Sequence, residues 1–422
     1  MTTDPYRRGL AHRTARFAAR RVDAMFSRHG PAFKQLAVSW AASVGGDTLV
    51  TVALAGTLFF SVPAADARGN VALYLAITLA PFAVVAPLLG GLFSRTRGVY
   101  RAVLTISGLL RTVLAIVMML GLATLWLYPM AFGMLVLSRL FGISKSSMLP
   151  VALPQPVALV GANALLARVG IVAGAVVLPL GAAAAAVDPA IALALAAVSF
   201  AVCTFTTLGL PDPREALRRD RELGVEEILA PMIEPPPVRS LRLVRLATAG
   251  VRLLNGFLLL LLAFEFRGAG AEGPDFAALI AAGGAGYALA SFISPALERV
   301  VREEPMVVAA LAIEAAAAFV AGQFFSLGAA AALAAAAGLA WGTAKFAFDG
   351  LLQASVTPER RGIAFTRSET VFQLAWVLGA ILPVTITMDA RVGLAIAGCA
   401  ALAAQTTFVA GLLARPHSER AL

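Results

Sequence analysis

Two lysines with matching neighbours are the residues whose types and spacing most directly suggest chemistry. The chain has 34 basic residues, of which only Lys34, Lys145 and Lys345 are lysines. The tetrapeptides Gly142–Lys145 and Gly342–Lys345 read GISK and GTAK, each within an apolar segment. A buried ammonium releases its proton readily, whereas a guanidinium stays charged. Both lysines therefore suit either a contact with an anion or a change of charge during a functional cycle.

Carboxylates are the groups that could titrate beside these lysines, because the three histidines lie in the terminal tails. Burial favours the neutral form of a carboxyl group, so Asp47, and then Asp349, are the predicted proton-coupling residues. Lys345 and Asp349 are four residues apart, which places them one helical turn apart on the same face. An internal ion pair that only holds helices together is the alternative for each charged residue.

The composition places these residues in a membrane protein. The chain is 59% hydrophobic and 14% charged, with a mean hydropathy of +0.84, whereas soluble domains hold about 25% charged residues. Apolar runs of roughly 20 residues, enough to span about 30 Å of hydrocarbon, follow one another along the chain. We predict an all-α polytopic protein with transmembrane helices at 36–62, 70–93, 102–124, 129–150, 164–187, 190–210, 243–265, 275–297, 306–326, 328–350, 368–388 and 392–413.

The segment 211–242 divides this chain into two halves. It is rich in prolines and in charges of both signs, and such charges are too costly for hydrocarbon. We predict a water-side connector here, between six-helix bundles at 35–210 and 243–414. A basic tail (1–34) and a short tail (415–422) complete the predicted organisation.

Arginines indicate the orientation of the spans. Most arginines fall in the predicted loops on the same side as the connector. The predicted loops on the other side hold only Arg68, Arg267 and Arg391, next to acidic residues. By the positive-inside rule, both termini and the connector are expected to be cytoplasmic, in the cytoplasmic (inner) membrane. The arginines on the connector side include Arg95, Arg97, Arg101, Arg299, Arg302, Arg360, Arg361, Arg367, Arg415 and Arg420.

The two six-span halves and several local motifs resemble the major facilitator superfamily. The loop after the second span, Gly90–Arg101, reads GGLFSRTRGVYR and is similar to that family's G-x-x-x-D-R-x-G-R-R, with Ser94 in place of the acid. Span four contains Arg139-Leu-Phe-Gly142, and span five contains Gly170-x3-Gly174 and Pro179-x-Gly181. The resemblance covers almost the whole chain. The gating residues that it implies are Gly90, Gly91, Ser94, Arg95, Arg97, Gly98 and Arg101.

The resemblance also implies two halves that rock about a central cavity lined by the first, fourth, seventh and tenth spans. Arg111 and Glu314, in the third and ninth spans, are then expected to be structural or lipid-facing, and Glu369, near a span end, to be solvated. Asp47 and Asp349 face the cavity as proton-coupling candidates. The substrate-binding candidates are Arg139, Lys145, Arg252, Asn255 and Lys345.

The resemblance implies secondary active transport, with proton-coupled export as one mode, and the surplus of cations in this cavity predicts an anionic or zwitterionic amphipathic small molecule as the substrate. A flippase for an anionic lipid, such as a lysophospholipid or a polyprenyl-phosphate-linked carrier, is one alternative. A transport-inactive scaffold or sensor on the same fold is another. No lysine follows a glycine, which excludes the G-x-x-x-x-G-K phosphate loop. We expect no enzyme activity, no cofactor or metal, no nucleic-acid partner, and a monomer in the lipid bilayer.

Overall fold

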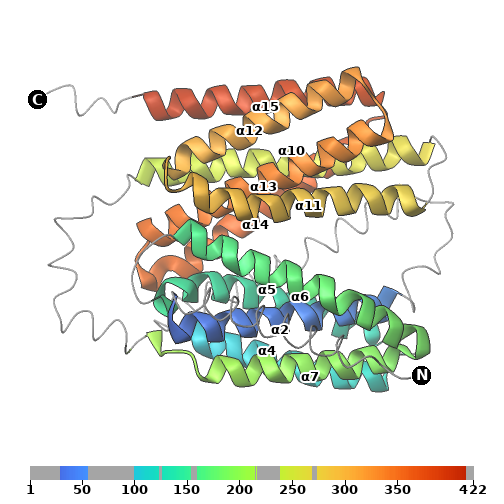
Figure 1. Cartoon of the computed structure of the whole chain (residues 1–422), viewed down its shortest axis with the longest axis vertical. Coiled ribbons are helices and arrows are strands. Elements are labelled where there is room, and N and C mark those ends of the chain that lie inside the picture. The colour runs from blue at the N-terminus through green and yellow to red at the C-terminus, as the bar shows by residue number, and fades with distance from the viewer. Residues whose placement is uncertain are drawn as a thin grey trace, which may run out of the picture.

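The computed structural model describes residues 29–55, 99–122, 126–153, 159–213, 215, 238–268 and 273–414. This part of the chain forms long helices joined by short connections, as the sequence predicts (Figure 1). The predicted second span, 70–93, lies outside the described residues. The helices are α2 (Gly30–Ala55), α4 (Tyr100–Leu120), α5 (Leu127–Ala152), α6 (Leu159–Val187), α7 (Pro189–Leu208), α10 (Val238–Gly268), α11 (Gly273–Leu297), α12 (Glu303–Gln323), α13 (Leu327–Ser355), α14 (Pro358–Thr385) and α15 (Ala390–Leu413).

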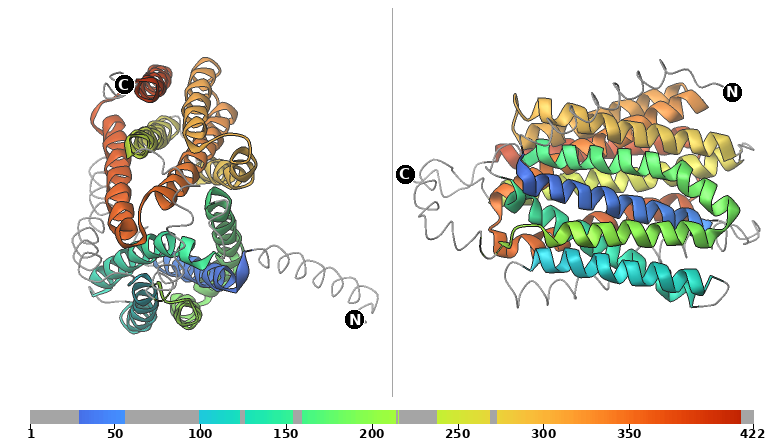
Figure 2. Two further views of the ribbon diagram at one scale, coloured as in Figure 1. Left: turned by 90° about the vertical axis from the view of Figure 1, so that its left-hand side faces the viewer. Right: turned by 60° about the horizontal axis from the view of Figure 1, so that its bottom comes forward.

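These helices form two bundles that lie side by side. Helices α2 and α4–α7 make the N-terminal half, and α10–α15 make the C-terminal half (Figure 1). The view along the helices shows the two groups meeting along α5, α6, α11, α13 and α14 (Figure 2, left). We call the end at which α7 finishes and α10 begins the connector end, and the opposite end the far end.

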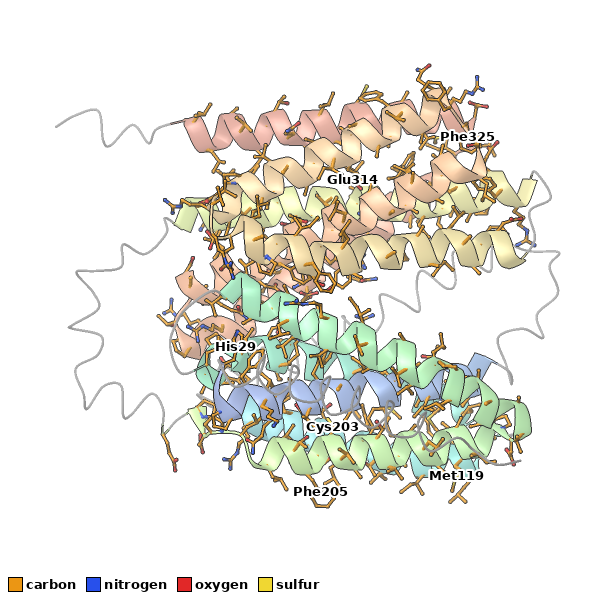
Figure 3. All side chains as sticks on the ribbon, in the orientation of Figure 1. His29, Met119, Cys203, Phe205, Glu314 and Phe325 are labelled. Carbon is orange, nitrogen blue, oxygen red and sulfur yellow. The ribbon has the colours of Figure 1, made fainter. Side chains whose placement is uncertain are left out.

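The outer surface of the bundles is apolar. Phe205, Val198 and Phe292 are each more than 60% exposed, and Phe205 projects from the outside of α7 (Figure 3). Ten of the described helices are long and apolar enough to cross a membrane, so the chain is a multi-pass membrane protein. Helix α5 carries Arg139, Lys145 and several serines, and it packs against α13 and α14 of the other half.

Small residues bring α11 and α13 close together, and this contact fixes the position of α13. A Cβ atom added to Gly286 would lie 1.8 Å from the Ala335 carbonyl oxygen, and one added to Gly338 would lie 2.0 Å from the Gly283 carbonyl oxygen. Glycine allows two membrane helices to approach until their backbones touch. Helix α13 carries both Lys345 and Asp349, so this packing positions the charged cluster described below.

The start of α14 differs from the prediction. The sequence predicts a span at 368–388, after a loop that contains Arg360, Arg361 and Arg367. In the structure the helix begins at Pro358, directly after its N-cap residue Thr357, and takes in all three arginines. Proline suits the first turn of a helix, where its missing N–H costs nothing. Glu369 therefore lies about three turns into α14 instead of at a solvated helix end.

Candidate functional site

A cavity of about 290 Å³ lies between the two halves. The N-terminal half contributes side chains of α2, α5 and α6, and the C-terminal half contributes side chains of α11, α13 and α14. Four aromatic residues line it, Trp40, Tyr287, Phe346 and Phe365. Its charged lining residues are Arg139, Lys145, Lys345, Asp349 and Glu369.

Lys345 is held by two carboxylates within this cavity. Its Nζ donates to Asp349 Oδ1, one turn along α13, and lies 2.7 Å from Glu369 Oε1 on α14. The predicted pairing of Lys345 with Asp349 is therefore present. Glu369 is a partner that the sequence reasoning missed, because the predicted span began only one residue before it. One ammonium between two carboxylates leaves a cluster with one excess negative charge when both acids are ionised.

Lys145 has a different environment on the opposite wall. Its Nζ lies 4.1 Å from the centroid of the Trp40 ring, a cation–π contact between α5 and α2. Among the described residues, no carboxylate lies within ion-pair distance of this ammonium. The two matched lysines thus line one cavity, but among the described residues only Lys345 has carboxylate partners.

The other predicted substrate contacts are only partly brought together. Arg139 lines the cavity. Arg252 stacks over Trp341 and Trp376, with its Cζ 4.6 Å and 5.7 Å from the two ring centroids, and it is not a lining residue of the cavity. Asn255 faces away from the cavity.

Asn255 instead pairs with Glu314 inside the C-terminal half. Its Nδ2 donates to Glu314 Oε1 at 3.2 Å and to the Val251 carbonyl at 2.9 Å. Glu314, on α12 (Figure 3), is 1% exposed, and its Oε2 has no hydrogen-bond partner among the described residues. The structure therefore places Glu314 between α10 and α12, inside the bundle and not against lipid.

Asp47, the first proton-coupling candidate, is paired inside the N-terminal half. Arg111 on α4 is fully buried and donates from Nη1 to Asp47 Oδ1 at 3.2 Å. Ser138 Oγ donates to Asp47 Oδ2 at 2.8 Å. Phe141 and Phe200 cover the guanidinium, with ring centroids 4.8 Å and 4.6 Å from its Cζ. Arg111 therefore fits the structural role expected for it, and it has a charged partner that the sequence did not indicate.

The predicted gating residues cannot all be placed. Gly90, Gly91, Ser94, Arg95, Arg97 and Gly98 lie outside the described residues. Arg101, in the first turn of α4, donates from Nη1 to the carbonyl oxygen of Leu210 at 3.0 Å. This contact ties α4 to the end of α7, at the connector end of the N-terminal half.

The two halves are joined at the connector end. Gln353 of α13 accepts a hydrogen bond from Asn163 Nδ2 at 2.6 Å and donates to the Ser146 carbonyl at 2.8 Å. Tyr100 donates to the Pro358 carbonyl and accepts from the Gly362 N–H at 3.3 Å. These hydrogen bonds between the two halves all lie toward the connector end. In Figure 1, α6 and α11 separate toward the far end.

Glu298, just beyond α11, completes this closure. Its two carboxylate oxygens accept from the N–H groups of Val160 and Gly161 at 3.1 Å and 2.9 Å, at the start of α6. Burial raises the pKa of Glu298, against the opposing effect of these two N–H donors. The N-terminus of α6 stabilises this carboxylate, because the unpaired N–H groups at a helix N-terminus carry partial positive charge.

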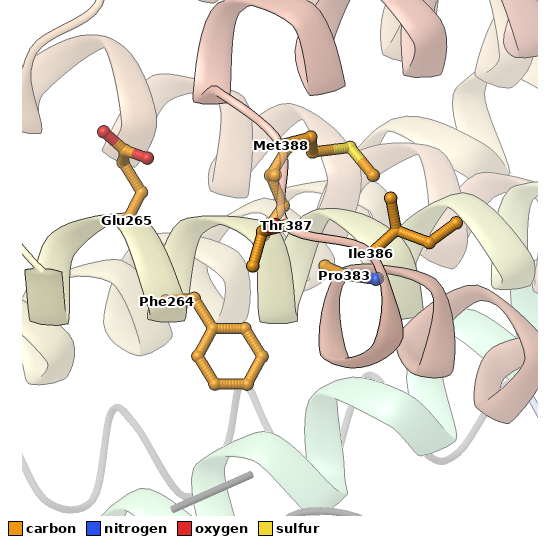
Figure 4. Close-up of a pocket in the computed structure, with 7 residues that line it drawn as sticks. Phe264, Glu265, Pro383, Ile386, Thr387 and Met388 are labelled. Carbon is orange, nitrogen blue, oxygen red and sulfur yellow. The ribbon is translucent and has the colours of Figure 1, made fainter.

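A second cavity, of about 190 Å³, lies at the far end of the C-terminal half. Phe264 and Glu265 of α10 line it, together with Pro383 of α14 and Ile386–Met388 beyond that helix (Figure 4). Among the described residues that line it, Glu265 is the only charged one. The described lining residues all belong to the C-terminal half, so this cavity does not combine residues of the two halves as the central cavity does.

Comparison with known structures identifies the fold. The human organic anion transporter MFSD10 (TETRAN) superposes with a TM-score of 0.68 at 16% identity, over 90% of this chain and 100% of that one. A bacterial homologue of the iron transporter ferroportin, in an outward-facing state, gives 0.65 at 16% identity, over 91% and 100% of the two chains. At this identity the likeness shows the fold, which is that of the major facilitator superfamily.

Sequence comparison identifies relatives among mycobacterial proteins. No protein-family model matches the chain. The uncharacterized protein ML2143 of Mycobacterium leprae is 29% identical over 385 residues, which cover 82% of this chain and 66% of the relative. The uncharacterized protein Rv0876c of Mycobacterium tuberculosis is 31% identical over 393 residues, which cover 85% and 70%. The chain thus spans about two thirds of the length of these relatives. It belongs to the same family as Rv0876c, and it has the fold of the major facilitator superfamily.

Proposed function

We propose that this chain is a secondary active transporter that binds an organic anion in the cavity between its halves. The observation that carries this proposal is the ammonium of Lys145, which faces the cavity without a described carboxylate partner. An anion that enters the cavity gains a charge-assisted contact there. The aromatic side chains around the cavity suit an amphipathic substrate with an apolar body. The neighbour MFSD10, which has the same fold, is described as an organic anion transporter.

Alternating access is proposed as the mechanism. The contacts of Gln353, Tyr100 and Glu298 hold the connector end closed, while the halves separate toward the far end. The excess of arginines near the connector supports a cytoplasmic position for that end. In this conformation the central cavity would therefore be open toward the outside of the cell. Rocking of the two halves would break these contacts and expose the cavity to the cytoplasm.

Proton coupling is proposed at the cluster of Lys345, Asp349 and Glu369. Two carboxylates share one ammonium, so the addition of one proton makes the cluster neutral and strengthens the attraction of the cavity for an anion. Asp47 is less suited, because Arg111 already balances its charge and Ser138 occupies its second oxygen. Anion and proton would bind together, and the direction of net transport follows from the gradients.

Proteoliposomes containing the full chain test the substrate proposal. Uptake of benzoate, octanoate and lysophosphatidylglycerol is measured for the parent protein, for Lys145→Ala and for Arg391→Ala, which removes an exposed cation at the far end. Loss of a contact worth about 1.5–3 kcal/mol weakens binding roughly 10- to 150-fold in Lys145→Ala, with little change in thermal stability. The control should transport as the parent does.

The outcomes separate the alternatives. If Lys145→Ala binds and transports all three anions as the parent does, the anion-site proposal fails. Movement of the lysophospholipid alone would identify a flippase. Binding without flux in the parent protein would favour a scaffold or sensor.

A second experiment tests the site of proton coupling. In the same vesicles, Asp349→Asn should abolish uptake driven by a pH gradient while leaving anion exchange largely intact. Asp47→Asn should retain pH-driven uptake. If Asp47→Asn abolishes pH-driven uptake and Asp349→Asn retains it, Asp47 is the coupling residue.

A further inference from the structure

Arg168 is a cation on the outer face of the seam between the two halves. It lies in the third turn of α6, and Val172 and Val176, one and two turns further along the same face, are 61% and 57% exposed. Helix α6 runs beside α11 of the other half, at the edge of the molecule (Figure 2, left). Residues four apart share one face of a helix, so Arg168 belongs to a stripe that faces the hydrocarbon of the membrane.

The surroundings of Arg168 contain an aromatic ring and no described counter-charge. Its Cζ lies 4.9 Å from the centroid of the Phe292 ring on α11, and that phenylalanine is 61% exposed. Its Nε is buried without a hydrogen-bond partner, and none of the described carboxylates forms an ion pair with it. Glu298, beyond the end of α11, has both oxygens occupied by the N–H groups at the start of α6.

A cation in this position lacks sufficient stabilisation from the protein alone. Placing a charged side chain in hydrocarbon costs more than one aromatic contact returns. A guanidinium presents parallel N–H donors that match the oxygens of a phosphate. The long side chain of Arg168 can extend toward the polar surface at the connector end, about nine residues or roughly 13 Å of helix away.

We propose that Arg168 binds the phosphate of an anionic phospholipid at the seam between α6 and α11. The headgroup contacts the guanidinium, and the acyl chains lie along Val172 and Val176 on α6 and along Phe292 on α11. The bound lipid therefore touches both halves near the end at which they are closed. This site is separate from the central cavity, although Ala167, the preceding residue, lines that cavity.

Lipid titration of the full chain in a zwitterionic detergent tests this proposal. Native mass spectrometry measures the affinity for phosphatidylglycerol and for phosphatidylcholine with the same acyl chains, and a thermal melt in parallel measures stabilisation by each lipid. The parent protein should prefer phosphatidylglycerol. Arg168→Gln should weaken phosphatidylglycerol binding about tenfold or more, and it should weaken phosphatidylcholine binding less, because the choline of that lipid already neutralises its phosphate. Arg391→Gln, at the exposed far end of the molecule, is the matched control and should bind as the parent does.

Three results would overturn the lipid site. The first is equal phosphatidylglycerol affinity in Arg168→Gln and the parent. The second is equal stabilisation by inorganic phosphate, which would identify a free anion in place of a lipid. If Arg168→Gln does not fold, Arg168→Lys keeps the charge but loses the paired N–H donors, and it should bind phosphatidylglycerol several-fold more weakly than the parent. The third result that would overturn the lipid site is phosphatidylglycerol binding by Arg168→Lys that equals that of the parent.

Discussion

The two halves of this protein have a lysine at matching positions of α5 and α13, but the surroundings of the two ammonium groups differ in charge. Lys145 rests against Trp40 and has no described acidic partner, whereas Lys345 lies between Asp349 and Glu369. The N-terminal wall of the cavity therefore offers a cation, and the C-terminal wall offers a cluster that is balanced or negative. The comparison shows that a repeated lysine need not have a repeated role, because its role depends on the acids that neighbouring helices bring to it.

The same contrast extends to the polar pairs inside each half. In the N-terminal half, Asp47 of the first helix pairs with Arg111 of the third predicted span, so the charges balance. In the C-terminal half, Asn255 and Glu314 occupy the corresponding spans, and no cation among the described residues forms an ion pair with Glu314. One half is thus organised by an ion pair and the other by an amide–carboxyl hydrogen bond.

The largest expected effect is on stability, in Lys345→Ala. Removing the ammonium leaves Asp349 and Glu369 close together in a largely buried site, and loss of one partner from a buried ion pair costs about 3–5 kcal/mol. The unfolding free energy in detergent micelles measures this. Lys145→Ala, which strands no acid, is the control and should change stability little. The triple variant Lys345→Ala, Asp349→Asn, Glu369→Gln should recover much of the loss, and equal losses in both single lysine variants would remove the contrast.

A smaller effect is expected from Asp47→Asn in the N-terminal half. The amide keeps a hydrogen-bond acceptor for Arg111 but removes the opposite charge, and hydrogen bonds to charged groups contribute about 1.5–3 kcal/mol. Circular dichroism during thermal unfolding would report the loss. If Arg111→Met alone destabilises the protein as much as Arg111→Met combined with Asp47→Asn does, the two residues are coupled as the structure indicates. Additive losses would mean that Asp47 and Arg111 act independently.

The smallest effect is expected from Glu314→Gln in the C-terminal half. Glu314 has no cationic partner among the described residues, and one of its oxygens makes no hydrogen bond, so an uncharged amide of the same shape removes no ion pair. We expect a change within about 1 kcal/mol, of either sign. The matched substitution Glu369→Gln, which weakens the contact with Lys345, should cost more. A large loss in Glu314→Gln would reveal a partner for this carboxyl group and would weaken the contrast between the halves.

The sequence alone indicated the membrane class and most of the described helices. These features depend on local properties, since span length and hydropathy are set by each segment itself. The predicted and observed bounds agree within a few residues for helices such as α7 and α15. The sequence places the start of α14 too late because three arginines and two glutamates before residue 370 resemble a loop in a hydropathy pattern, although they lie on a helix.

The tertiary structure decided which polar residues meet. The sequence predicts that Lys345 lies beside Asp349, because residues four apart on a helix share one face. Glu369 lies on another helix, so its contact with Lys345 depends on how α13 and α14 pack. Asn255 was expected in the cavity and points to Glu314, while Arg111 turned out to be the partner of Asp47. Most of the described spans are rich in alanine, glycine and leucine on all faces, so hydrophobic periodicity marks the side that turns inward only weakly. The rotation of each helix about its axis follows instead from close packing against its neighbours, as at Gly286 and Gly338.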